Sequence, residues 1–159
     1  MDIIEIYSKS MKFYFEIKGK IVVIGGDSGT GKTLFFNAVI ENGGVDNPDS
    51  PTVALSRESL MDAEILKLIV EKNEDKIFVI DNAEYLLTRE SIDIINNDIN
   101  NRYIIIGRGV NIRGLRTSFL SYAEIYLDKE ENTFKLNYPL SRENRKNYIL
   151  NSFKGGEKI

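Results

Sequence analysis

The sequence contains short runs of consecutive apolar residues, and stretches with helical periodicity separate them. Three of these runs are Ile21–Ile24, Ile77–Ile80 and Tyr103–Ile106, each rich in β-branched side chains. A run of about four apolar residues bounded by glycine or polar residues is typical of a strand buried on both faces of a sheet. We therefore predict that these three segments form central strands.

Amphipathic helices are predicted between the strands. The first follows Thr33 and ends at Gly43-Gly44, since glycine commonly terminates a helix. The second begins at Ser59, where Asp62 three residues later completes a capping pattern. The third covers Ser91 to Ile99. The apolar residues at helical spacing are Leu34, Phe35, Ala38 and Val39 in the first helix, Ile65, Leu66, Ile69 and Val70 in the second, and Ile92, Ile95 and Ile99 in the third.

Both ends of the chain show the alternation that is typical of β-hairpins. Residues 1–17 alternate around Ser8-Lys9-Ser10, and two apolar segments, 124–127 and 133–138, flank the polar residues 128–132. A short strand over residues 52–55 and a last polar helix from Ser141 complete the predicted elements.

Short strands that alternate with helices imply an α/β fold with a mostly parallel sheet covered on both faces. We predict one domain over residues 1–159. Its parts are an N-terminal hairpin (1–19), a core (20–127) and a C-terminal hairpin strand and helix (128–159).

Composition narrows the available chemistry. Hydrophobic residues make up 42% and charged residues 28% of the 159 residues, as in ordinary globular proteins. The lack of cysteine excludes disulfides and thiolate metal sites, and the lack of histidine removes the commonest general base. The groups left for catalysis are carboxylates, lysine, arginine, hydroxyls, backbone N–H groups and a bound Mg²⁺. This set suits phosphoryl transfer.

We expect a soluble, cytoplasmic protein with no membrane partner. Asp2 and Glu5 interrupt the apolar N-terminus, unlike a signal peptide, and no apolar run approaches the roughly 18 residues of a membrane span. The net charge of −3 gives no overall attraction to nucleic acid, so only a local basic patch could bind it.

The run between the first predicted strand and the first predicted helix matches G-x-x-x-x-G-K-[ST] at every fixed position. Glycine lets the backbone curl so that successive N–H groups face one anion, and the following helix adds its positive end. Lys32 would neutralise the β- and γ-phosphates, and the Thr33 hydroxyl would bind Mg²⁺. The predicted nucleotide-binding residues are Gly26, Asp27, Ser28, Gly29, Thr30, Gly31, Lys32, Thr33 and Leu34.

Asp81 comes directly after the second buried strand. In a phosphate-binding fold this strand can lie beside the first and bring the Asp81 carboxylate to the metal, directly or through a water. We predict that Thr33 and Asp81 bind the Mg²⁺ that accompanies ATP.

With these two motifs the chain resembles the P-loop NTPase superfamily, with Gly26 to Thr33 as Walker A and Ile77 to Asp81 as Walker B. The resemblance implies a three-layer α/β/α fold, here with β-hairpins added at the edges of the sheet. The segment after Asp81 is similar to that of AAA+ and related ATPases, in which a Glu directly after the Asp polarises the attacking water. Asn82 occupies that position here, so Glu84 is the candidate carboxylate, and hydrolysis is expected to be slow.

The third predicted strand ends in Gly107-Arg108. This is similar to the fourth strand of STAND-type ATPases, which ends in an Arg that senses the γ-phosphate. The candidate catalytic residues are therefore Lys32, Glu84 and Arg108. Arg113 and Arg116 follow, where they could meet phosphate, an acidic partner or RNA, or lie in a solvated loop.

Three functions remain open. The first is an ATPase or ATP-driven switch that acts on a partner protein, a second copy of the chain or nucleic acid. The second is a small-molecule or nucleotide kinase, in which Arg108, Arg113 and Arg116 could serve as lid arginines. The third is a non-hydrolysing ATP-binding module, which Asn82 favours. The sequence has neither the Asn-Lys-x-Asp motif of GTP-binding proteins nor the Leu-Ser-Gly-Gly-Gln motif of ABC proteins.

Overall fold

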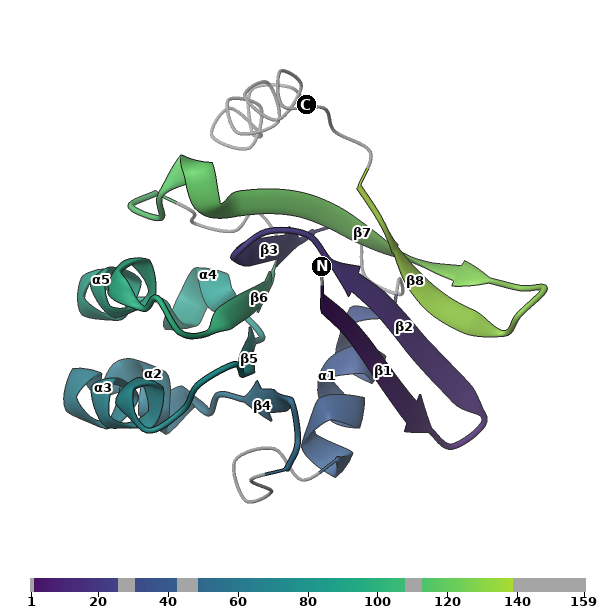
Figure 1. Ribbon diagram of the computed structural model, residues 1–159, viewed down its shortest axis with the longest axis horizontal. Coiled ribbons are helices and arrows are strands. Elements are labelled where there is room, and N and C mark those ends of the chain that lie inside the picture. The colour runs from purple at the N-terminus through teal and green to yellow at the C-terminus, as the bar shows by residue number, and fades with distance from the viewer. Residues whose placement is uncertain (1, 26–30, 43–48, 108–112, 139–159) are drawn as a thin grey trace.

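The computed structural model describes residues 2–25, 31–42, 49–107 and 113–138. Within these ranges the chain is a mixed α/β structure with one eight-stranded sheet and five α-helices (Figure 1). The strands are β1 (Asp2–Ser8), β2 (Met11–Ile17), β3 (Ile21–Ile24), β4 (Thr52–Ala54), β5 (Ile77–Ile80), β6 (Arg102–Ile106), β7 (Leu120–Asp128) and β8 (Thr133–Asn137). The helices are α1 (Lys32–Glu41), α2 (Arg57–Met61), α3 (Ala63–Glu71), α4 (Ala83–Leu86) and α5 (Arg89–Asn97), with a 3-10 turn η2 (Thr117–Phe119). Within the described ranges, no helix has the length and apolar character needed to cross a membrane.

The strand order across the sheet is β1-β2-β8-β7-β3-β6-β5-β4. The five strands from β7 to β4 are mutually parallel. The two hairpins, β1–β2 and β7–β8, are antiparallel, and β2 pairs with β8 in parallel. The hairpins expected around Ser8-Lys9-Ser10 and residues 128–132 are therefore both present, although β7 is longer than expected and also pairs with β3.

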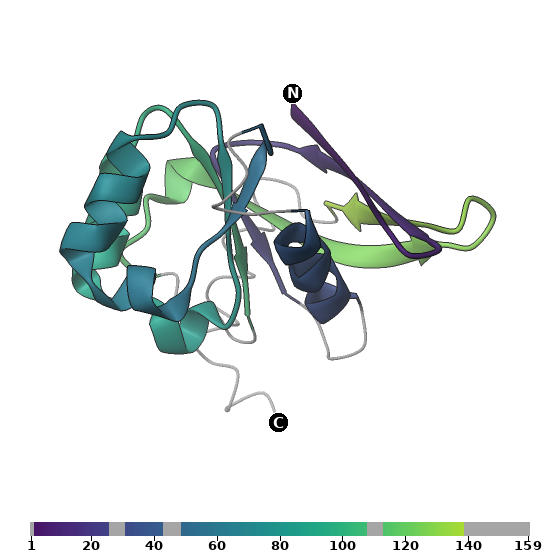
Figure 2. The ribbon, with the colours of Figure 1, turned by 90° about the horizontal axis from the view of Figure 1, so that it is seen from below.

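The central strands are buried on both faces, as their continuous apolar runs predict. Successive side chains point to opposite sides of the sheet, so that Val23 and Ile105 pack in one core while Val22 and Ile104 pack in the other. The first core also contains side chains of α2, α3 and α5, and the second contains those of α1. Figure 2 shows α1 on one side of these strands and the other helices on the opposite side.

The sheet curves around α1, which contacts both β1 and β4, the two edge strands. Phenylalanine rings pack between α1 and the added hairpins. The ring of Phe35 on α1 lies 4.6 Å from Phe15 and 5.6 Å from Phe13, measured between centroids. Phe13 in turn stacks on Phe134 of β8 at 5.0 Å. The added hairpins therefore pack against α1, the helix that follows the predicted phosphate-binding run.

The helix expected from Ser59 is two helices. Ser59 lies inside α2, and its N–H donates to the hydroxyl of Ser56, which caps that helix. Asp62 has an extended backbone and starts α3 by accepting the N–H groups of Glu64 and Ile65 at 3.0 and 3.3 Å. A carboxylate that caps a new helix competes with the continuation of the old one, which explains the break.

The expectation that Ile99 lies on the buried face of the third helix is wrong. Helix α5 ends at Asn97, and Ile99 is 89% exposed, whereas Ile92 and Ile95 are buried as expected. Asp98 causes the turn: its carboxylate accepts the N–H of Asn100 at 2.9 Å and the hydroxyl of Tyr103 at 2.6 Å. These bonds direct the chain into β6 instead of a further helical turn.

The expectation that the Asp81 strand lies beside the first strand is also wrong. β6 lies between β3 and β5 and pairs with both in parallel. β6, which Gly107 follows, is therefore the strand adjacent to β3, which precedes the predicted phosphate-binding run.

Candidate functional site

The carboxyl ends of β3, β6 and β5 meet at one edge of the sheet. Ile24 is in register with Ile106, and Ile80 with Ile105. The chain leaves β3 toward α1 on one face and leaves β5 toward α4 and α5 on the other. A crevice forms where connections depart to opposite faces, and this is where ligands bind in open parallel sheets.

A pocket of about 570 Å³ occupies this crevice. Its volume lies within the range of small-molecule sites. It is lined by Gly31, Lys32, Thr33, Leu34, Asp81, Asn82, Glu84, Tyr85, Ile106 and Gly107.

Lys32 and Thr33 reach the pocket because they open α1. Gly31 precedes them with φ 98°, a left-handed conformation that favours glycine, and its carbonyl accepts the N–H of Phe35 at 2.9 Å. A Cβ atom on Gly31 would lie 2.9 Å from Cε1 of Phe134 and 3.2 Å from Cγ2 of Ile125. Both the backbone conformation and the contact with β7 and β8 therefore require glycine at this position.

Asp81 and Glu84 reach the pocket from β5 and α4. The Asp81 Oδ1 atom accepts the N–H of Asn82 at 2.9 Å. Asn82 has φ 54° and ψ 40°, a left-handed conformation that Asn tolerates better than most residues. This kink starts α4 directly and places Glu84 in its first turn. Asn82 thus has a backbone role that the sequence motif alone did not reveal.

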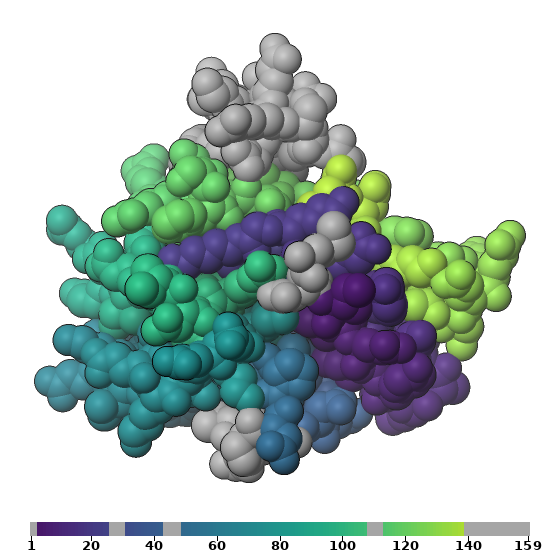
Figure 3. Space-filling view, in the orientation of Figure 1, coloured from purple at the N-terminus to yellow at the C-terminus, as the bar shows by residue number. Residues whose placement is uncertain are grey.

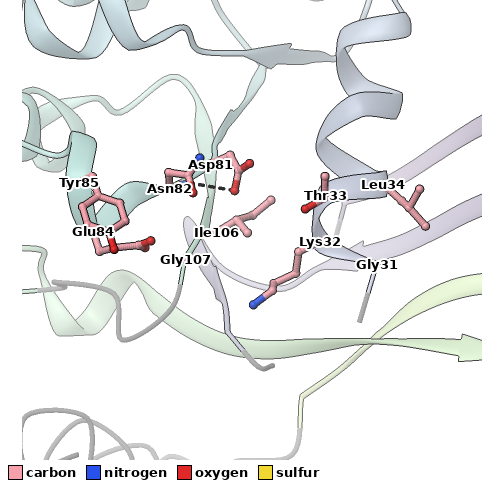
Figure 4. Close-up of a pocket in the computed structure, with 10 residues that line it drawn as sticks. All are labelled: Gly31, Lys32, Thr33, Leu34, Asp81, Asn82, Glu84, Tyr85, Ile106 and Gly107. Atoms are coloured by element: carbon pink, nitrogen blue, oxygen red, sulfur yellow. Dashed lines mark hydrogen bonds between the residues drawn. The ribbon is translucent and has the colours of Figure 1, made fainter. Parts of the chain in front are cut away.

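Figure 4 shows how these side chains are directed. The hydroxyl of Thr33 and the carboxylate of Asp81 face the same space between α1 and β5. The amino group of Lys32 extends below them, and the carboxylate of Glu84 enters from the opposite side. Leu34 turns away from the others (Figure 4) and is 48% exposed, so its side chain is peripheral to this group.

Glu84 carries a buried polar atom. Within the described residues its Oε2 atom has no hydrogen-bond partner. A buried carboxylate oxygen without a donor is unfavourable by roughly 1–3 kcal/mol or more. A ligand or water that donates a hydrogen bond in the pocket would relieve this cost.

The residues that line the pocket fit a divalent cation that arrives with a polyphosphate. No group of three or more acidic residues that could hold a metal ion is present in the described part of the chain. Mg²⁺ at phosphate sites takes only one or two protein ligands and completes its octahedron with phosphate oxygens and water. The hydroxyl of Thr33 and the carboxylate of Asp81 are of that kind.

Several residues singled out in the sequence lie outside the described ranges. They are Gly26, Asp27, Ser28, Gly29, Thr30 and Arg108, together with the helix expected from Ser141. Gly107, which precedes Arg108, does line the pocket.

Arg116 does not lie near the pocket, contrary to one interpretation of the sequence. It precedes η2 and β7, whose first residue, Leu120, is in register with Ile21 at the start of β3. Arg116 is therefore at the amino-terminal edge of the sheet, opposite the pocket. Arg113 is exposed and is not among the residues that line the pocket.

Three features of this site have no signal in the sequence motifs. Tyr85, which is 82% exposed, forms part of the rim, and Ile106 forms part of the lining. The contact of Phe134 with Gly31 joins residues more than a hundred positions apart, for which the sequence holds no local signal.

Comparison with known proteins gives little further information. No family model matches the chain, and no curated protein matches it. A solved structure with a related arrangement is the N-terminal domain of zonular occludens toxin from Neisseria meningitidis. It has 17% sequence identity and a TM-score of 0.45, and the match covers 70% of this chain and 78% of the other. A likeness this distant does not identify a ligand or an activity.

Proposed function

We propose that this chain is a P-loop NTPase with a three-layer α/β/α core, and that the pocket binds ATP together with Mg²⁺. One observation carries the proposal. Lys32 and Thr33 at the start of α1 line the same pocket as Asp81 at the end of β5, although they are about fifty positions apart. A cation, a hydroxyl and a carboxylate in this arrangement match the needs of a metal-bound triphosphate.

Each residue then has a distinct role. Residues 26–33 would surround the phosphates with backbone N–H groups, and Lys32 would neutralise the terminal phosphates. Thr33 and Asp81 would hold Mg²⁺, which neutralises charge on the β- and γ-phosphates when bound. Arg108, the residue after Gly107 in the sequence, would stabilise charge on the transferred phosphoryl group.

Glu84 is the proposed residue for orienting a water. Asn82 carries an amide, which cannot accept a proton, so it cannot act as a base. Glu84 lines the pocket and has a buried carboxylate oxygen without a donor in the described residues. We infer a slow ATPase, at or below about 1 s⁻¹, in which turnover depends on Glu84.

The output of such a slow ATPase would be a change of state that a partner reads. A cytoplasmic location, a protein partner or a homo-oligomer fits this role, and a partner could supply the missing catalytic group in trans. A small-molecule kinase is less well supported, because Arg116, one of the proposed lid arginines, lies at the opposite edge of the sheet. A non-hydrolysing ATP-binding module remains the alternative that Asn82 favours.

Phosphate release from ATP·Mg²⁺ tests the proposal. The parent protein is expected to turn over slowly, and Glu84→Gln is expected to lower the rate by about a hundredfold or more while ATP binding persists. Parent turnover that survives Glu84→Gln would place the base elsewhere. Transfer of phosphate to a small acceptor would favour the kinase, and binding without any turnover would favour the regulatory module.

A further inference from the structure

The edge of the sheet opposite the pocket carries a group of cations. Here β3 and β7 begin side by side, because Ile21 is in register with Leu120. The turn before β3 contains Lys18 and Lys20, and Arg116 precedes η2 and β7. A Cβ on Gly19 in this turn would lie 2.9 Å from the Ser121 hydroxyl, so the two segments are in close contact.

Lys20 and Arg116 share one aromatic ring. The Nζ atom of Lys20 lies 4.2 Å, and the Cζ atom of Arg116 5.6 Å, from the ring centroid of Phe119. Asn96 joins the two segments, since its backbone carbonyl accepts a hydrogen bond from the Lys20 amino group at 3.3 Å and its side-chain oxygen accepts one from the backbone N–H of Arg116 at 3.0 Å. Two like charges thus lie against the same ring. Partial burial lowers the pKa of Lys20, the charge of Asp98 opposes this, and Arg116 lowers it further.

Lys18 adds a third cation on the same turn. Its Nζ atom lies 5.0 Å from the ring centroid of Tyr138, and the hydroxyl of Tyr138 accepts the Lys18 N–H at 3.3 Å. Lys18 and Arg116 are both exposed. Lys20 also lines a hollow of about 510 Å³ at this edge, together with Lys76, Arg102 and one carboxylate, Asp75.

Within the described residues, no carboxylate forms an ion pair with Lys18, Lys20 or Arg116. The charge of the Asp98 carboxylate raises the pKa of Lys20, but Asp98 is only 6% exposed. It already accepts hydrogen bonds from Tyr103, Asn101 and the N–H of Asn100. The edge is therefore locally positive on a chain of net charge −3. An anion bound between these cations would relieve their mutual repulsion.

We propose that Lys18, Lys20 and Arg116, which we name the basic edge, bind the backbone of a single-stranded nucleic acid. Cations beside partly exposed aromatic rings are the combination that single-strand binding surfaces use, with phosphates on the cations and bases against the rings. An acidic protein partner would be bound through the cations alone, so the aromatic rings favour a nucleic acid. The edge lies away from the ATP pocket, so the proposal does not depend on nucleotide binding.

Fluorescence anisotropy of a labelled oligonucleotide of about 20 nucleotides tests this, because single-strand domains cover roughly 4–16 nucleotides. Oligothymidylate and oligouridylate probes distinguish a DNA from an RNA source. We expect saturable binding at low salt, with the logarithm of affinity falling by about 2 per tenfold rise in salt, about 0.7 for each of three phosphate contacts.

The test variant is Lys18→Gln/Arg116→Gln, and the matched control is Lys9→Gln/Lys129→Gln, whose two lysines lie in the neighbouring β1–β2 and β7–β8 turns. All four side chains are exposed, so folding is not at risk, and both variants change net charge equally. Lys129 follows β7, whose nine residues place it about 30 Å from the basic edge. Figures 1 and 3 show the β7–β8 turn projecting from the body of the molecule.

We expect the test variant to lose about tenfold or more in affinity and to reduce the salt slope by about 1.4, while the control keeps both. Equal losses in the two variants, or no binding by the parent at low salt, would overturn the proposal. Competition by polyglutamate as strong as that by the oligonucleotide would indicate an acidic protein partner. Binding of a duplex as tight as that of the single strand would exclude a contribution of the rings, and displacement of the oligonucleotide by ATP would place it in the pocket. Each of these three results would also refute the proposal.

Discussion

Gly31→Ala perturbs the junction between the proposed phosphate-binding run and α1. The left-handed backbone at φ 98° costs an alanine roughly 1–2 kcal/mol. The added Cβ would lie 2.9 Å from Cε1 of Phe134, a ring that is 6% exposed and stacked on Phe13, so it cannot move freely. Overpacking of this kind costs roughly 1–3 kcal/mol. We expect Gly31→Ala to lower the free energy of unfolding by about 2–5 kcal/mol.

Urea unfolding and ATP titration together measure this effect. Gly114→Ala is the matched control, since Gly114 has φ 97° but its nearest contact is Cγ2 of Ile92 at 3.2 Å, away from the pocket. We expect the control to lose roughly 1–2 kcal/mol and to bind ATP normally. In a double-mutant cycle, Phe134→Leu should offset part of the cost of Gly31→Ala. If Gly31→Ala were as stable as Gly114→Ala and bound ATP like the parent, the proposed role of the Phe134 contact would be refuted.

Three further predictions follow from individual contacts. Tyr103→Phe removes a buried hydrogen bond of 2.6 Å to Asp98 and is expected to cost about 1.5–3 kcal/mol in urea unfolding; an unchanged midpoint would contradict this. The hydrogen bond from Lys135 lowers the pKa of Asp128 below its ordinary value of 3.8, so its stabilising contribution is present above that value and is lost as the pH falls through the lowered pKa. Melting temperatures of the parent and Asp128→Asn should therefore converge in acid, and parallel curves would count against the ion pair. Asp81→Asn is expected to weaken the Mg²⁺ dependence of ATP binding without unfolding the protein, and an unchanged Mg²⁺ titration would reduce Asp81 to a structural role.

Elements with a strong local pattern could be predicted from the sequence. The strands β3, β5 and β6 are rich in consecutive apolar residues because both of their faces are covered, and their short length and β-branched side chains favour strands over buried helix. The two hairpins were also predicted, since their alternation and polar turns are local properties. Lys32, Thr33, Asp81 and Glu84 line one pocket, and the roles that the motifs suggest for them stay predictions.

Features that depend on tertiary contacts could not be predicted. The insertion of β6 between β3 and β5 is a matter of strand order, which apolar runs do not specify. Asp98 ends α5 because it bonds to Tyr103 and Asn100, so the helical spacing of Ile99 was misleading. The left-handed backbone at Asn82 explains that residue in conformational terms, where the motif suggested only a missing base.

Calorimetric titration of ATP·Mg²⁺ into the parent and Lys32→Ala shows whether the pocket binds ATP through Lys32. Lys32 lines the pocket from the first residue of α1, where its charge would meet the terminal phosphates. Lys67→Ala, a change at an exposed lysine of α3, controls for the loss of one positive charge. We expect the parent and Lys67→Ala to bind ATP alike and Lys32→Ala to bind at least about tenfold more weakly, a loss of about 1.4 kcal/mol. Equal affinity in all three proteins would contradict the proposed ATP site.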